Sequence, residues 1–252
     1  MTKDEVFGSN QNSNVRPSEV TVESGSKFIG ATFLYMTIAL AITFGIVGIL
    51  GAIFKFAIFN GNEDYLETFA IIFFAALIAY IPVMIWVHIA ARRNGKTVGP
   101  AFFTYSIVMG ALIAPICIVF DFWTILIALG TTVLAFAVMA LIAWTSKKNL
   151  SNLAVIGFGL LVGALVLSLF NIILYLVNPG AYSVIYTLVS VLFFVAIILL
   201  TIFDLNSVKR IAMNGGATRN VAFLCALNLY VDFIYIFIRI LRIVAILFAN
   251  RR

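Results

Sequence analysis

Seven long runs of apolar residues, separated by short polar or Gly/Pro-containing breaks, make up most of the chain. A helix of about 20 apolar residues is long enough to cross the hydrocarbon core of a bilayer. The pattern therefore predicts an all-α membrane protein with seven transmembrane helices, over residues 29–54, 67–90, 101–120, 123–145, 153–177, 182–206 and 221–248. Residues 1–28 are polar and mixed in charge, so we expect a disordered tail followed by one seven-helix domain over residues 29–250.

Composition agrees with this prediction. Hydrophobic residues are 63% of the chain and charged residues 10%, whereas a soluble domain is nearer to half apolar and a quarter charged. The lipid bilayer is therefore the expected surroundings of the protein. The net charge of +6 does not indicate a nucleic-acid partner, because the basic residues are scattered over short loops and form no continuous basic face.

The basic residues alternate with the breaks between the apolar runs. The first, third and fifth connections contain only one basic residue, Lys55. By the positive-inside rule, the basic connections and the N-terminal tail are expected in the cytoplasm and the C-terminus outside, in a multi-pass protein of the plasma membrane. Eight basic residues lie in the second, fourth and sixth connections: Arg92, Arg93, Lys96, Lys147, Lys148, Lys209, Arg210 and Arg219.

A polar stripe runs through the last apolar segment. Its members follow one another at spacings of 3, 4, 3, 4 and 3, which places them on one face of a helix. Asp232 in this stripe and Asp204 near the end of the preceding segment are the only acidic residues well inside apolar segments. A charge in hydrocarbon is costly unless it is paired or hydrated, so intramembrane carboxylates predict a functional site. The stripe consists of Cys225, Asn228, Asp232, Tyr235, Arg239 and Arg242.

Two carboxylates that approach each other in a site of low dielectric constant cannot both ionise cheaply. Such a pair can act as a proton-sensitive latch, and when doubly ionised it requires a cation. That cation could be a protein Arg or Lys or a metal ion, and hard oxygen ligands suit Ca²⁺. Asp204 and Asp232 are therefore the candidate pH sensor and gate and the candidate metal ligands. Their separation stays open, because it depends on whether the sixth loop dips inward or the seventh helix begins near Thr218.

Structural roles are the alternative for both carboxylates. Asp204 could lie at the membrane interface and pair with Lys209 or Arg210, and Asp232 could belong to a purely structural polar network. His88, the only histidine, lies at the cytoplasmic end of the second segment, where it could be structural or sense pH. The candidate partners of the carboxylate pair, in a latch or a network, are Arg92, Arg93, Asn228, Tyr235 and Arg239.

These segments resemble a known family. ALNLYVDFIYIFIRILRI, residues 226–243, resembles the C-terminal signature of the Bax inhibitor-1 family (transmembrane Bax inhibitor motif-containing proteins), A-L-x-L-Y-L-D-x-x-N-L-F-x-x-L-L-R. FDLNSVKRI, residues 203–211, is similar to the D-x-Q-x-I region of its sixth helix, and TSKKNLSNL, residues 145–153, resembles its T-K-R-D-L-S stretch. Tyr235 stands in place of the usual Asn, and Asn206 in place of the common Gln.

The resemblance implies a bundle with the seventh helix at its centre and a pH-sensitive Ca²⁺ leak gated by two aspartates, here Asp204 and Asp232. It also implies that an arginine of the second helix, Arg92 or Arg93, can pair with the sixth-helix aspartate. Ca²⁺ would be the transported or bound ion, and no other cofactor is expected. Eukaryotic members are linked to cell-death control and bacterial members to a membrane protease, which makes such a protease a candidate partner. The short tail and compact loops suit a bacterial member.

Three other functions compete with a leak channel. An intramembrane aspartyl protease also uses two aspartates on consecutive helices, but its G-x-G-D sequence is absent before Asp232 and no P-A-L sequence occurs, so we do not expect an enzyme. A non-conducting regulator of a membrane protease or a cell-death pathway would use the carboxylates only structurally. A proton-coupled transporter would move protons together with a substrate.

Overall fold

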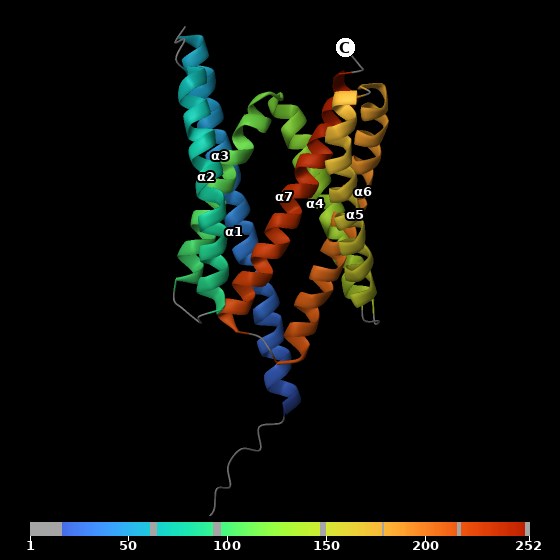
Figure 1. The fold of residues 1–252 in the computed structure, drawn as a ribbon. Helices are drawn as coiled ribbons and strands as arrows, with labels where there is room; N and C mark the ends of the chain where they lie inside the picture. The colour runs from blue at the N-terminus through green and yellow to red at the C-terminus, as the bar shows by residue number, and fades with distance from the viewer. Residues whose placement is uncertain are drawn as a thin grey trace, which may run out of the picture.

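The computed structural model describes residues 17–60, 65–92, 97–146, 150–177, 179–215 and 218–249. These residues form seven helices and no strand (Figure 1). In chain order the helices are α1 (Pro17–Phe59), α2 (Tyr65–Arg92), α3 (Val98–Ile118), α4 (Phe122–Thr145), α5 (Ser151–Val177), α6 (Pro179–Met213) and α7 (Arg219–Ala249).

Six of the seven described helices have the length and the surface of membrane-spanning segments. Within the described residues, α1 to α6 are each long and apolar enough to cross a bilayer. Large apolar side chains such as Ile78, Leu134 and Val155 point outward from them, as expected for a surface that faces lipid rather than water. The prediction of an all-α membrane protein is therefore confirmed.

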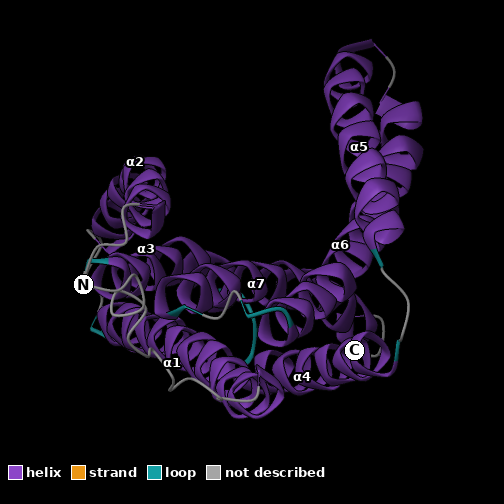
Figure 2. Ribbon diagram, turned by 90° about the horizontal axis from the view of Figure 1, so that it is seen from below, coloured by secondary structure: helices purple, strands orange, loops and turns teal. Residues whose placement is uncertain are grey.

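The bundle has a body, formed by α1, α3, α4 and α7, and two arms, one formed by α2 and the other by α5 with α6 (Figures 1 and 2). α7 packs against α1, α4 and α6 and more lightly against α2 and α3. α2 stands on α3 at one side, whereas α5 packs on α6 and forms with it the arm at the other side (Figure 2). Tyr230 and Phe237 of α7 are fully buried in the body, whereas Asn228 and Tyr235 on the polar stripe of the same helix are exposed.

A close contact between α1 and α3 supports α7. Gly110 of α3 faces α1 so closely that a Cβ atom there would lie 2.9 Å from the Thr43 carbonyl oxygen and from Ile46 Cβ. Beside this contact, the Thr43 hydroxyl donates to the Ser106 carbonyl at 2.9 Å and lies 2.7 Å from the Tyr230 hydroxyl. Because Thr43 has only one proton to donate, Tyr230 is the donor in the second bond. These bonds join α1, α3 and α7 in the core.

Two helices extend beyond the limits expected from sequence. α1 begins at Pro17 rather than at residue 29, so residues 17–28 are helical where a disordered tail was expected, and residues 1–16 lie outside the described residues. α6 continues to Met213 rather than ending at residue 206. The two extensions cross each other, since a Cβ atom on Gly25 would lie 2.8 Å from the Ala212 carbonyl oxygen. This contact joins two segments that are far apart in the chain, so local hydrophobic periodicity cannot predict it.

The turn between α6 and α7 follows from local chemistry. Gly215 has a φ of 79°, a backbone conformation that glycine adopts without steric cost. The Thr218 hydroxyl accepts a hydrogen bond from the Val221 amide at 3.4 Å, so Thr218 caps the N-terminus of α7. The Lys209 ammonium donates to the carbonyls of Trp144 and Ser146 at the end of α4, which fixes the last turns of α6 on α4.

Candidate functional site

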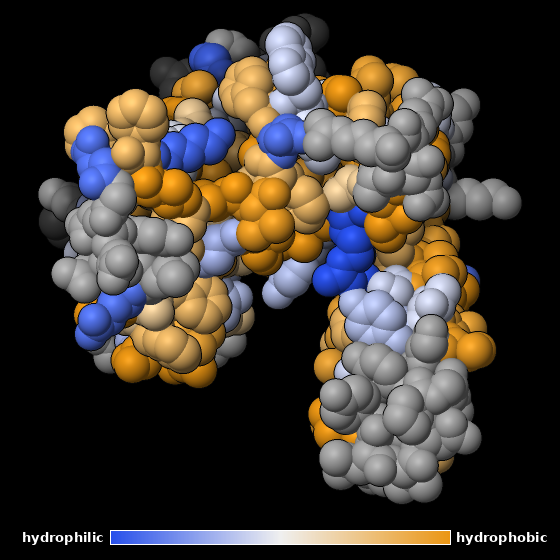
Figure 3. All heavy atoms as spheres, turned by 90° about the horizontal axis from the view of Figure 1, so that it is seen from above, coloured by the Kyte–Doolittle hydropathy of each residue, from blue (hydrophilic) through white to orange (hydrophobic). Residues whose placement is uncertain are grey.

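The two intramembrane carboxylates share one cavity. It has a volume of about 320 Å³ and lies between α2, α3, α6 and α7. The view from the C-terminal end of α7 shows a hollow between the two arms, with hydrophilic side chains in it (Figure 3). The cavity is lined by Tyr80, Met84, His88, Tyr105, Asp204, Leu227, Asn228, Val231, Asp232 and Tyr235.

The helix limits bring the carboxylates to similar depths. Asp204 lies nine residues before Met213 at the end of α6, or ~13 Å along the helix axis. Asp232 lies thirteen residues after Arg219 at the start of α7, or ~20 Å. Since the short turn joins these two helix ends, the extension of α6 moves Asp204 inward toward the level of Asp232. The sequence left this separation open, and in the structure both carboxylates line the same cavity.

The surroundings of Asp232 are polar but incomplete. Its Oδ2 atom is buried and has no hydrogen-bond partner among the described residues. The Thr201 hydroxyl of α6 lies beside the carboxyl group, yet it donates its proton to the Ile197 carbonyl at 2.8 Å. Asp204 is the acidic neighbour across the cavity. A buried carboxylate oxygen that has no hydrogen-bond partner in the protein requires a proton, an ion or a water molecule as its partner.

Three tyrosines and a histidine complete the wall. The Tyr105 hydroxyl donates to the Tyr80 hydroxyl at 3.2 Å, and Tyr235 lies next to the same Tyr80. The ring of His88 has its Nδ1 atom 2.9 Å from the Met84 carbonyl oxygen. We did not predict Tyr80 and Tyr105 from the sequence, although Tyr80 shares one face of α2 with Met84 and His88 at a spacing of four residues.

The predicted partners of the carboxylates have different positions. Asn228 and Tyr235 line the cavity, but Arg239 donates a hydrogen bond to Ser190 of α6. Arg92 is the last residue of α2, one turn beyond His88, and its side chain and the whole of Arg93 lie outside the described residues.

Lys209, one of the two possible interfacial partners of Asp204, is engaged elsewhere. The hydrogen bonds of the Lys209 ammonium go to the end of α4, and Arg210 is an exposed residue of the last turn of α6. Asp204 itself faces the cavity. The described side chains that line the cavity thus supply two carboxylates and one histidine, with no Lys or Arg.

The donor set favours a hard, hydrated cation over a tightly chelated metal. Among the described residues, no three His, Cys, Asp or Glu side chains come together as a metal cluster. Ca²⁺ takes six to eight oxygen ligands, so Asp204 and Asp232 could supply only part of its shell. Asn228, the tyrosine hydroxyls and water would have to supply the rest.

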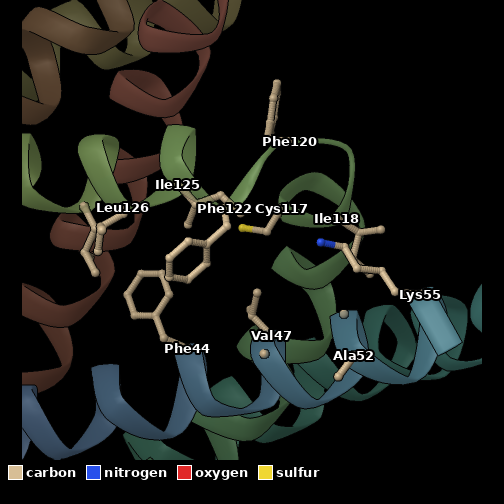
Figure 4. A pocket seen from close by; sticks show the side chains of 13 residues that line it. Phe44, Val47, Ala52, Lys55, Cys117, Ile118, Phe120, Phe122, Ile125 and Leu126 are labelled. Atoms are coloured by element: carbon tan, nitrogen blue, oxygen red, sulfur yellow. The ribbon is translucent and has the colours of Figure 1, made fainter.

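A second cavity, of about 480 Å³, lies between α1, α3 and α4 and has a different character (Figure 4). Phe44, Val47 and Ile125 are typical of its apolar walls. The Lys55 side chain reaches across it from α1 toward α3 (Figure 4) and is the only charged side chain among the described residues that line it. With one cation and no carboxylate, this cavity lacks the chemistry for a proton-sensitive pair.

The fold and the first cavity define a class: a multi-pass helical membrane protein with two carboxylates facing one intramembrane cavity. The family model described as "Inhibitor of apoptosis-promoting Bax1" matches residues 25–250, which is almost the whole chain. The protein belongs to this family, the Bax inhibitor-1 family, as the sequence motifs indicated.

Several bacterial membrane proteins are similar to the chain. An uncharacterized membrane protein of Streptococcus pyogenes serotype M1 is 31% identical over 174 residues, which cover 68% of this chain and 73% of that protein. The inner membrane protein YbhL of Escherichia coli K12 is 31% identical over 156 residues, covering 60% and 62%. The protein YrjE of Lactococcus lactis is 29% identical over 163 residues, covering 64% and 67%.

Proposed function

We propose that the protein is a pH-sensitive calcium leak channel, without enzymatic activity, whose gate is the pair Asp204 and Asp232. One observation carries the proposal: both carboxylates face one cavity, and one oxygen of Asp232 is buried there without a hydrogen-bond partner among the described residues. Doubly ionised, the pair attracts a divalent cation. Protonation removes the cation site and lets one carboxyl group donate a hydrogen bond to the other. Ion occupancy and helix position would then both follow pH.

The size of the cavity supports a partly hydrated ion. A volume of about 320 Å³ has room for several water molecules, each of which occupies about 30 Å³. The ion could therefore keep water as part of its shell while Asp204 and Asp232 replace the rest. A leak needs such weak, exchangeable coordination, because an ion held by a complete protein shell would not leave.

The membrane topology is part of the same proposal. α7 would cross the bilayer as the seventh span, at the centre of the bundle, because its apolar faces are buried in the body and the middle of its polar stripe, Asn228, Asp232 and Tyr235, faces the cavity. The N-terminus would lie in the cytoplasm and the C-terminus outside, in a bacterial plasma membrane. The basic ends of α2 and α6 lie at the same end of the bundle as the start of α1 (Figure 1), which is the arrangement that the positive-inside rule needs.

The test is Ca²⁺ flux into liposomes that contain the purified full chain, measured across roughly pH 5 to 8, the range that includes histidine titration. The wild type is compared with Asp232→Asn, which keeps the shape of the side chain and removes its charge. We expect a pH-dependent flux in the wild type and a flux in the variant that no longer follows pH.

A second variant separates the carboxylates from the other titratable groups of the cavity. His88 of α2 faces the same space, as do the tyrosines of α2, α3 and α7, and Cys225 of α7 is a neighbour of Asp204 of α6. His88→Gln should keep the pH dependence of the flux if the carboxylates are the sensor. Loss of pH dependence in His88→Gln, with Asp232→Asn unchanged, would contradict the aspartate gate.

The alternative function is a non-conducting regulator of a membrane protease or a cell-death pathway. The description of the family, which names inhibition of an apoptosis-promoting protein, favours this alternative. In that case the two carboxylates would be structural, and the purified protein would give no flux at any pH. Co-purification with a membrane protease from bacterial membranes would then be the measurement of choice.

A further inference from the structure

We propose that Arg239 and Arg242 of α7, together with Ser190 and Tyr186 of α6, bind a phosphate oxyanion at the end of the hollow between the arms. The two guanidinium groups are one turn apart on the polar stripe of α7 and reach the same helix. Arg239 donates a hydrogen bond to the Ser190 hydroxyl, and Arg242 donates one to the Tyr186 hydroxyl. This site is separate from the aspartate pair and does not depend on ion conduction.

The charge balance of the site points to an anion. Neither guanidinium contacts a carboxylate among the described residues: their hydrogen-bond partners are the neutral hydroxyls, and Arg242 also lies over the Tyr186 ring at 5.9 Å. Asp204 and Asp232 face the first cavity, between α2, α3, α6 and α7, instead. Arg239 is half-buried and Arg242 is exposed, and two like charges one helical turn apart repel each other. An oxyanion between them would remove this repulsion.

The geometry suits phosphate in particular. A guanidinium presents a planar fork of N–H donors that matches the oxygens of a phosphate, and hydroxyl groups can add further donors. Arg242 and Tyr186 are exposed, so an anion can reach the pair from outside the protein. The space-filling view shows hydrophilic side chains in this hollow against otherwise apolar walls (Figure 3).

The depth of the pair agrees with a phospholipid head group. Arg239 lies twenty residues after Arg219, ~30 Å along α7, and Arg242 lies ~35 Å along it. Because the hydrocarbon core is ~30 Å thick, the two arginines reach the head-group level at the end of α7 opposite Arg219. The phosphate could come from a lipid of that leaflet or from free inorganic phosphate.

The experiment measures binding to the delipidated full chain in detergent, by native mass spectrometry and by thermal stabilisation. The probes are dioleoyl phosphatidylglycerol, dioleoylglycerol, which has the same chains without the phosphate, and inorganic phosphate. We expect the Arg239→Gln/Arg242→Gln double variant to bind phosphatidylglycerol at least about tenfold more weakly than the wild type, which is about 1.4 kcal/mol. Dioleoylglycerol should bind both proteins equally.

Lys55→Gln is the matched control, because it removes one cation from the wall of the second cavity, between α1, α3 and α4, and not from the proposed site (Figure 4). It should bind phosphatidylglycerol like the wild type. If the double variant is not stable, Arg242→Gln and Ser190→Ala are measured singly, and each should weaken binding.

The two possible sources of the phosphate give different results. Stabilisation by inorganic phosphate that is lost in the arginine variants would support the site with a free anion. Retention of phosphatidylglycerol without any effect of inorganic phosphate would support it with a lipid. Equal binding of phosphatidylglycerol by wild type and arginine variants, or an equal loss in Lys55→Gln, would overturn the proposal, because binding would then not depend on this pair.

Discussion

Substitution of Gly110 by alanine tests the contact that joins α1 to α3 and, through Tyr230, to α7. The added Cβ would lie 2.9 Å from both the Thr43 carbonyl oxygen and Ile46 Cβ, whereas such atoms normally rest at about 3.5–4.0 Å. Because one of the two is a backbone atom, the helices themselves must separate by roughly 0.5–1 Å.

The expected cost follows from three contributions. Overpacking costs about 1–3 kcal/mol, and weakening the Thr43–Tyr230 bond costs ~0.6 and at most ~1.7 kcal/mol. The better helix propensity of alanine returns up to about 1 kcal/mol. Gly110→Ala should therefore lower the free energy of unfolding by roughly 0.6–4.7 kcal/mol.

The assay is unfolding by sodium dodecyl sulfate in mixed micelles, followed by circular dichroism. Gly130→Ala is the control, since its Cβ would meet nothing within 4 Å, and it should leave stability unchanged or raise it slightly. If Gly110→Ala were as stable as Gly130→Ala, the close contact of α1 and α3 would not exist as described.

The remaining predictions use the same unfolding assay or the flux assay. Tyr230→Phe removes the buried bond to α1 and should cost ~0.6 and at most ~1.7 kcal/mol; an unchanged stability would mean that this bond does not form. Gly157→Ala, whose Cβ would lie 3.1 Å from Leu200 Cγ and 3.3 Å from the Ala196 carbonyl oxygen, should destabilise the arm of α5 and α6, whereas Gly159→Ala on the same helix should not. Asp204→Asn should flatten the pH profile of Ca²⁺ flux, because a lone Asp232 has no acidic partner with which to share a proton, and a profile like that of the wild type would contradict the paired gate.

Much of the candidate site was predictable because its main residues are charged or polar side chains within apolar segments. An aspartate in an apolar segment is conspicuous in any sequence, and the spacing of Asn228, Asp232 and Tyr235 places them on one face of a helix whatever the neighbours are. Tyr80 and Tyr105 gave a weaker indication, since tyrosine is also common in membrane helices as an interfacial residue. Only their contact with each other and with the cavity distinguishes them.

The sequence by itself determined the helical membrane fold, the family and the polar face of α7, because length, hydropathy and helical periodicity are local properties of the chain. The tertiary structure alone decided which side chains meet. α1 and α6 cross at Gly25 and Ala212, and Ala212 belongs to the extension of α6 that brings Asp204 toward the level of Asp232. The position of α6 likewise decided that Arg239 bonds to Ser190, since a guanidinium can reach a carboxylate or a hydroxyl equally well. Such choices depend on contacts between segments far apart in the chain, and local periodicity does not contain them.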